Sequence, residues 1–144
     1  MARYLLILAA VILAVPGLLS SCAPAAKTDV TLSYTCDEFS SAKSIEKSID
    51  ATVGNKITVN LCSNRTTGYS WPEKAQISDP QVVEQTSYKW VPPESTGAVG
   101  VAGTEVYTFK VLQPGTSTIY LEYSRSWQGG EKGTWTFKLN VNAH

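Results

Sequence analysis

The chain has 144 residues, and its 12 basic and 12 acidic side chains give a formal net charge of zero. This balance argues against a nucleic-acid partner, which would favour a basic excess, and the 43% share of apolar residues excludes a largely disordered chain. The one histidine, His144, is the last residue, so no Ser-His-Asp triad and no histidine metal site can form within the domain; we expect no enzymatic activity, metal or cofactor.

Residues 1–21 have the pattern of a secretory signal peptide. Arg3 gives a positive start, and residues 4–15 form an apolar run that is too short to span a membrane and ends at a Pro-Gly pair. The Leu-Ser-Ser-Cys that ends at Cys22 resembles a bacterial lipobox. This resemblance implies cleavage before Cys22, a lipid on its sulfur, and an extracytoplasmic protein anchored to the cell membrane. An uncleaved anchor and a plainly secreted protein are the alternatives.

The region after the lipobox is predicted to be a tether over residues 22–35, followed by one folded domain over residues 36–144. Residues 36–43 are predicted to form one helical turn. In an oxidising compartment Cys36 and Cys62 can pair, and such a disulfide would contribute about 3.5 kcal/mol in the chain-entropy model. Two unrelated buried thiols are the other interpretation.

Seven β-strands are predicted, because apolar and polar residues alternate with period two in segments rich in Val, Ile, Thr, Tyr and Trp. The segments are 44–53, 56–62, 70–77, 82–91, 104–112, 117–124 and 134–141. Seven antiparallel strands in about 100 residues indicate an all-β, immunoglobulin-like sandwich. Trp71 and Trp135 are predicted to lie in its core, and Trp90 to lie at its rim or to cap it.

Short and long connections alternate between these strands. The turns at 54–55, 79–80 and 114–115 are short, whereas the connections 63–69, 92–103 and 125–133 are long. Since consecutive antiparallel strands run up and down in turn, all three long connections emerge at one end of the sandwich. Long loops usually persist because they bind something, so this end is predicted to be the functional one.

Three motifs in these long connections resemble those of the chagasin-like inhibitors of cysteine peptidases. The chain has Asn-Arg-Thr-Thr-Gly-Tyr at 64–69, Gly-Val-Ala-Gly at 100–103 and Arg-Ser-Trp at 125–127. The family carries Asn-Pro-Thr-Thr-Gly-Tyr/Phe, Gly-x-Gly-Gly and Arg-Pro-Trp/Phe at these places. The resemblance spans about residues 44–142 and implies a monomeric inhibitor of papain-like peptidases. The 63–69 loop would enter the active-site cleft, with the 97–103 and 125–130 loops on either side.

The resemblance also implies which residues bind the peptidase. Thr66, Thr67 and Gly68 would lie over the catalytic cysteine, Trp127 would stack on the cleft wall, and Arg125 would contact the peptidase or bond to carbonyls of its own loop. The full set is Asn64, Arg65, Thr66, Thr67, Gly68, Tyr69, Gly100, Val101, Ala102, Gly103, Arg125, Ser126 and Trp127.

Three residues depart from the family motifs. Arg65 and Ser126 replace prolines, and Ala102 replaces a glycine. Each is expected to weaken the preorganisation of its loop, because a fixed φ angle or a tolerated positive φ angle is lost. Two other functions also fit the sequence: a surface adhesion or glycan-binding module that stacks Trp127 and Tyr69 on its ligand, and a structural envelope lipoprotein whose loops bind nothing.

Overall fold

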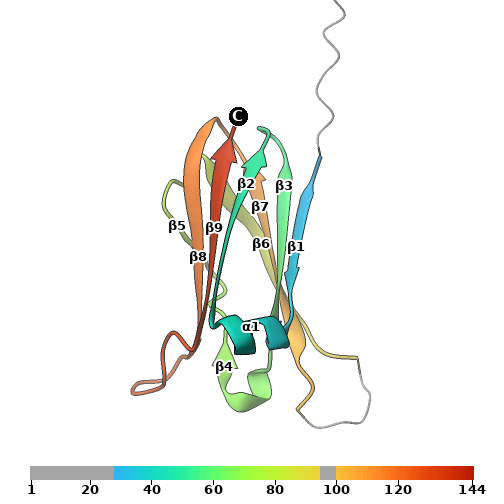
Figure 1. Cartoon of the computed structure of the whole chain (residues 1–144), viewed down its shortest axis with the longest axis vertical. Helices are drawn as coiled ribbons and strands as arrows, with labels where there is room; N and C mark the ends of the chain where they lie inside the picture. Colours follow the sequence, from blue (N-terminus) through green and yellow to red (C-terminus); the bar gives the residue numbers. More distant parts are fainter. Residues whose placement is uncertain (1–27, 95–99) are drawn as a thin grey trace, which may run out of the picture.

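Two β-sheets pack face to face in the computed structural model, which describes residues 28–94 and 100–144 (Figure 1). The predictions for residues 1–27 therefore lie outside the described residues. The first sheet has the order β1 (Val30–Tyr34), β3 (Lys56–Ser63), β7 (Gly103–Val111) and β6 (Val83–Val91). The second has the order β2 (Ser44–Ala51), β9 (Trp135–Ala143), β8 (Gly115–Arg125) and β4 (Tyr69–Ser70), with β5 (Gln76–Ile77) also paired to β8.

The predicted helical turn is confirmed as α1 (Cys36–Ala42). A capping box starts it: the Thr35 amide donates to the Glu38 carboxylate at 2.7 Å, and the Glu38 amide donates to the Thr35 hydroxyl at 3.3 Å. The bond from the Thr35 amide, together with a second bond that the Thr35 hydroxyl donates to the same carboxylate at 2.9 Å, lowers the pKa of Glu38. Phe39 enters the core from this helix. No helix within the described ranges has the length and apolar character that crossing a membrane requires.

The predicted all-β sandwich is confirmed, but two of its strand pairs are parallel. β1 runs parallel to β3, and β2 runs parallel to β9. The short turn predicted at 54–55 is confirmed, because the Asn55 amide donates to the Thr52 carbonyl at 2.9 Å, but the strands that it joins, β2 and β3, belong to different sheets. The Gly54 amide donates to the Val111 carbonyl at 2.8 Å. This bond fixes the turn at the point where the chain passes from one sheet to the other.

The predicted tether is wrong over residues 30–35. Val30 pairs with Ile57 and Tyr34 with Leu61 along β1, and Leu32 packs partly buried against the core. The alternation of Val30, Leu32 and Tyr34 with polar residues gives this segment one apolar face, which the sandwich covers. The folded domain therefore begins no later than Val30.

The predicted strand over residues 70–77 is broken into the short strands β4 and β5. Pro72 cannot donate a ladder hydrogen bond, and the residues that follow it bond to a side chain instead. Gln85 accepts from the Ala75 amide at 2.8 Å and donates to the Glu73 carbonyl at 2.7 Å. This bridge from β6 supports the connection between the two short strands.

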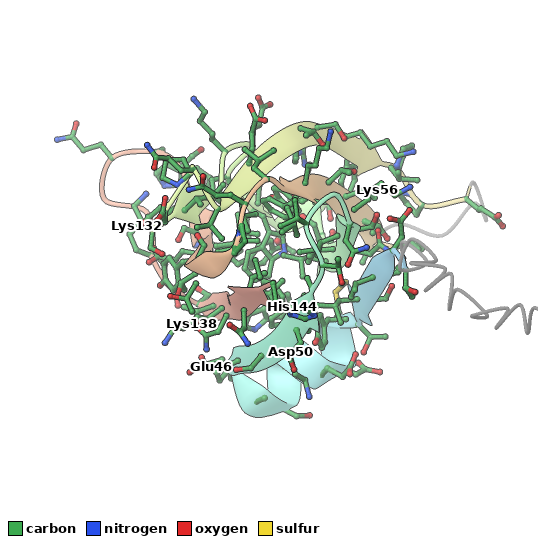
Figure 2. All side chains as sticks on the ribbon, turned by 90° about the horizontal axis from the view of Figure 1, so that it is seen from above. Glu46, Asp50, Lys56, Lys132, Lys138 and His144 are labelled. Atoms are coloured by element: carbon green, nitrogen blue, oxygen red, sulfur yellow. A yellow bond between two sulfur atoms is a disulfide. The ribbon has the colours of Figure 1, made fainter. Side chains whose placement is uncertain are left out.

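Side chains fill the space between the sheets, and charged groups such as Glu46 and Lys138, which pair at 3.0 Å, lie on the outer face of β2 and β9 (Figure 2). Trp71 lies in the core with 1% of its surface exposed, and Trp135 packs half-buried at its edge. Cys36 and Cys62 form a disulfide with their Cα atoms 5.2 Å apart. This bond joins the start of α1 to the end of β3.

Candidate functional site

The three loops emerge at one end of the sandwich, as predicted, for the part of each loop that the structure describes (Figure 1). The 63–69 loop leaves β3, residues 100–103 lead into β7, and the 125–130 loop follows β8. Residues 97–99 of the second loop lie outside the described residues. The chain enters β1 and ends after β9 at the opposite end of the molecule (Figure 1).

The 63–69 loop folds into one short 3₁₀ turn, Arg65–Thr67, that is organised by Asn64. The Asn64 carbonyl accepts from the amide and the hydroxyl of Thr67 at 3.1 and 2.6 Å, and its side-chain oxygen accepts from the Thr66 hydroxyl at 2.6 Å. Gly68 ends the turn with a φ of +82°, a left-handed conformation that favours glycine. The turn leaves Thr66 and Thr67 exposed.

Asn64 also fastens this loop to its surroundings. Its amide donates to the Tyr123 hydroxyl at 2.9 Å, and its side-chain nitrogen donates to the Gly100 carbonyl at 2.8 Å. The second bond joins the 63–69 loop to the 97–103 loop. Asn64 was predicted to bind the peptidase, and its side chain is directed to these neighbours within the molecule.

The Arg65 side chain keeps 39% of its surface exposed, but its head group is held against the strands beside the loop. Its Nε lies 3.3 Å from the Glu105 carboxylate, and a terminal nitrogen donates to the Tyr88 hydroxyl. Its guanidinium lies 4.6 Å from the centre of the Trp90 ring. The hydrogen bond to Glu105 raises the pKa of Arg65 further above its already high value.

Glu105 is a fully buried carboxylate, and the sequence analysis did not identify it. Besides Arg65 it accepts from the Ser63 hydroxyl and the Tyr88 hydroxyl, each at 2.8 Å. Burial, followed by the bond to Glu105, raises the pKa of Tyr88 to about 12. A signal was available, because Glu105 lies in the same inward phase of the strand as Tyr107 and its apolar successors.

Trp90 completes this group at the rim of the sandwich, which is one of the two positions predicted for it. It is half-buried and covers Gly103, where a Cβ atom would lie 2.4 Å from the tryptophan ring. We call Arg65, Tyr88, Trp90, Gly103 and Glu105 the Arg65 cluster. It joins the 63–69 loop to the strands β6 and β7.

A second group, the Arg125 cluster, joins the 63–69 loop to the 125–130 loop and consists of Gly68, Tyr69, Arg125 and Trp127. The Arg125 guanidinium lies 4.4 Å from the Tyr69 ring centre and 5.5 Å from that of Trp127. A Cβ atom on Gly68 would lie 2.5 Å from the Trp127 ring. Trp127 nonetheless keeps 51% of its surface exposed, as predicted.

Arg125 was predicted to contact the peptidase or to bond to carbonyls of its own loop. Its guanidinium packs on aromatic rings rather than bonding to those carbonyls, and its Nε is buried without a hydrogen-bond partner among the described residues. The contact with the peptidase stays a prediction. The Arg125 backbone takes up the loop bonding: its amide donates to the Glu131 carbonyl at 2.8 Å, and its carbonyl accepts from Lys132.

Below the Arg125 cluster, four aromatic rings stack in a row from α1 to the base of the loops. Ring centres are 5.4 Å apart between Phe39 and Trp135, 4.7 Å between Trp135 and Tyr123, and 5.5 Å between Tyr123 and Tyr69. The Tyr69 hydroxyl donates to Glu131, and this bond lowers the pKa of that carboxyl. The loops therefore rest on a rigid aromatic base.

The outward surface of this end mixes small, apolar and charged side chains. Thr66, Thr67, Val101, Ser126 and Trp127 are exposed there, Val101 to 38%. The head groups of Arg65 and Arg125 are engaged in the two clusters, although the Arg65 side chain keeps 39% of its surface exposed. Glu131 and Lys132 are exposed just after the 125–130 loop. Within the described ranges no group of His, Cys, Asp or Glu side chains is arranged to hold a metal ion. Such a preformed projection is suited to filling a cleft in another protein.

Comparisons with known proteins identify the family of the chain. Residues 50–141 match the family described as Chagasin family peptidase inhibitor I42. Chagasin of Trypanosoma cruzi is 30% identical over 94 residues, which cover 64% of this chain and 84% of that protein.

Two solved structures share the fold. The cysteine protease inhibitor EhICP2 from Entamoeba histolytica has a TM-score of 0.60 at 22% identity, with 80% of this chain and 95% of that chain covered. PbICP-C, solved in complex with falcipain-2, has a TM-score of 0.57 at 16% identity, with coverage of 80% and 99%.

Proposed function

Because this chain belongs to the chagasin family of peptidase inhibitors, we propose that it inhibits papain-like cysteine peptidases by placing the 63–69 loop in the active-site cleft. The 97–103 and 125–130 loops would contact the cleft on either side. The observation that carries the proposal is that two arginine–aromatic clusters fix the 63–69 loop to its neighbours and leave Thr66 and Thr67 exposed between them.

Preorganisation is the physical basis of such inhibition. A loop that already has its bound shape loses little conformational entropy on docking, so more of the contact free energy appears as affinity. The hydroxyls of Thr66 and Thr67 bond within the turn, which keeps the loop rigid over the catalytic cysteine. The peptide bonds of this turn need not be cleaved if none is held in line with the thiolate.

The glycan-binding alternative receives less support from the same end of the molecule. It requires two exposed aromatic rings that stack on a sugar. The Tyr69 ring already packs against Tyr123 and the Arg125 guanidinium, and its hydroxyl is bonded to Glu131. Trp127 is left as the one exposed ring of the pair.

Inhibition of papain by purified residues 23–144, titrated with a fluorogenic peptide substrate, tests the proposed function. We expect stoichiometric inhibition by the unmodified chain. Thr66→Arg should abolish it, because a long charged side chain at the exposed turn would keep the loop out of the cleft. Thr31→Arg, on an exposed position of β1, is the matched control and should inhibit normally. Equal inhibition by both variants would overturn the placement of the 63–69 loop.

We also propose that the chain is a lipoprotein, cleaved before Cys22 and anchored through that cysteine to the cell membrane. The support is the apolar run that ends in the lipobox-like Leu-Ser-Ser-Cys. The described chain enters the sandwich at the end away from the loops, so an anchor there would leave the loops free (Figure 1). In a bacterial host, labelled palmitate should enter the wild type and not Cys22→Ala. Equal labelling of the two would contradict the proposal.

A further inference from the structure

Arg65 stands where the family motif has a proline, a residue that would restrict the loop through its fixed φ angle. The side chain keeps 39% of its surface exposed, but its head group is engaged within the molecule. It lies 3.3 Å from Glu105, donates to Tyr88 and packs 4.6 Å from the centre of the Trp90 ring. All three partners lie on β6 and β7, outside the loops themselves.

We propose that Arg65 is a positioning residue, which fixes the 63–69 loop against β6 and β7 and does not itself contact the peptidase. This inference rests on the proposed function, because the inhibition constant measures how much the fixed loop contributes to binding. Contacts between distant parts of the chain would here supply the restriction that a proline supplies locally. The replacement of the family's proline by Arg65 was expected to loosen the loop. The contacts of the Arg65 side chain with β6 and β7 would compensate for that loss.

The burial of Glu105 makes this arrangement persistent. Its side chain has 0% of its surface exposed, so water cannot stabilise the carboxylate and the guanidinium must stay in place to neutralise it. The Tyr88 hydroxyl bridges the two, accepting from Arg65 and donating to Glu105 at 2.8 Å. An ion pair in which both partners were exposed to water would restrain the loop less firmly than this pair, whose carboxylate is buried.

The geometry demands an arginine rather than a positive charge alone. A guanidinium is planar and forked, so it can donate to two acceptors in its own plane while its face packs on an aromatic ring. A lysine ammonium could reach Glu105 but would leave Tyr88 or Trp90 without its partner. Arg65→Lys therefore separates positioning from simple charge.

Two measurements on the same variants test the inference. The first is hydrogen exchange in the free protein at the amides of Thr67 and Gly68, which donate to the Asn64 and Arg65 carbonyls at 3.1 and 3.0 Å. The amide of Gly54, at the opposite end, reports on global unfolding. The second measurement is the inhibition constant against papain.

In both Arg65→Lys and Tyr88→Phe we expect exchange at Thr67 and Gly68 to accelerate more than exchange at Gly54, whose change measures the loss of global stability alone. Inhibition should weaken about tenfold or more, since only a fraction of the molecules would hold the binding-competent loop. The double variant should inhibit no worse than Arg65→Lys alone, because both changes break one cluster. The matched control is Lys89→Ala, which removes an exposed charge next to Tyr88 on β6 and should behave like the wild type in both measurements.

Different results would overturn the inference. If Arg65→Lys inhibits like the wild type, the charge suffices and a direct contact with the peptidase explains it. If inhibition falls while exchange at Thr67 and Gly68 is unchanged, Arg65 acts on the peptidase and not on the loop. If the wild type inhibits no papain-like peptidase while exchange in the variants still rises, the proposed function fails and the internal restraint stands.

Discussion

Gly68 combines a backbone requirement with a packing requirement. Its φ of +82° strains any other residue, and a Cβ atom there would lie 2.5 Å from the Trp127 ring. Gly129, in the 125–130 loop, has a φ of +75° and open space around it. The two glycines therefore separate backbone strain from displacement of the tryptophan.

We expect Gly68→Ala and Gly129→Ala each to lower the free energy of unfolding by about 1 kcal/mol through backbone strain. Only Gly68→Ala should also weaken inhibition of papain strongly, because Trp127 must move away from the turn. Urea unfolding and inhibition assays measure the two effects. A similar loss of inhibition in both variants would show that strain in the loops, and not the Trp127 contact, governs binding.

Glu105 provides a second prediction for a single residue. Glu105→Leu leaves the Arg65 guanidinium and the hydroxyls of Ser63 and Tyr88 without their acceptor, so we expect a loss of about 3 kcal/mol in the free energy of unfolding. Glu105→Gln keeps an acceptor oxygen and should cost less. Urea unfolding of both variants tests this ranking, and Glu84→Gln, on the exposed side of β6, serves as the control. An equal cost for Leu and Gln would argue against a role for the acceptor.

Individual strands show what alternation can and cannot predict. The strands β3, β7, β8 and β9 lie within a few residues of their predicted ranges, because each has a long run of alternating residues. The strands β2 and β6 also match their predicted ranges, although their alternation is less regular. The segment of β1 has the same alternation over five residues but was assigned to a tether. The break between β4 and β5 depends on Pro72 and on a side chain of β6, and no local pattern encodes that partner.

The disulfide links two of these elements, since Cys36 begins α1 and Cys62 lies near the end of β3. The bridge closes a separation of 26 residues, for which the chain-entropy model gives about 3.5 kcal/mol. We expect the double variant Cys36→Ser/Cys62→Ser to unfold in urea with a free energy lower by about that amount.

Reductant gives the internal control for this prediction. It should destabilise the wild type to the level of the double variant and leave the double variant unchanged. Inhibition should fall as well, because the Cys62 carbonyl accepts from the Trp71 indole at 2.9 Å just before the 63–69 loop. A wild type that reductant does not destabilise would contradict the expected contribution of the bridge.

At the scale of the whole molecule, the sequence places the three loops at one end but not the contacts that fix them. The loop positions follow from strand count and connection lengths, and the exposure of Trp127 follows from its flanking residues. The partners of Arg65 lie about 20 to 40 residues away on strands, where their spacing resembles ordinary core or rim positions. Which of these residues meet depends on the pairing of β6 with β7 and on the packing of the sheets.

The same packing makes the stability of the whole molecule sensitive to alkaline pH. Burial and the bond to Glu105 raise the pKa of Tyr88 to about 12, and burial raises the pKa of Tyr107 as well. In the unfolded chain the pKa of a tyrosine is near its ordinary value of 10.0. Above that pH the unfolded chain binds fewer protons than the folded one, so the stabilising contribution is complete below pH 10 and is lost as the pH rises toward 12.

Tyr88→Phe tests this dependence, because phenylalanine has no proton to lose. We expect the free energy of unfolding, measured in urea at several pH values above 9, to fall less steeply in the variant than in the wild type. The variant should start from a lower stability near neutral pH, since the bonds of Tyr88 to Arg65 and Glu105 are gone. Parallel declines in the two proteins would mean that the Tyr88 phenol titrates normally and that Glu105 is less isolated from water than its burial indicates.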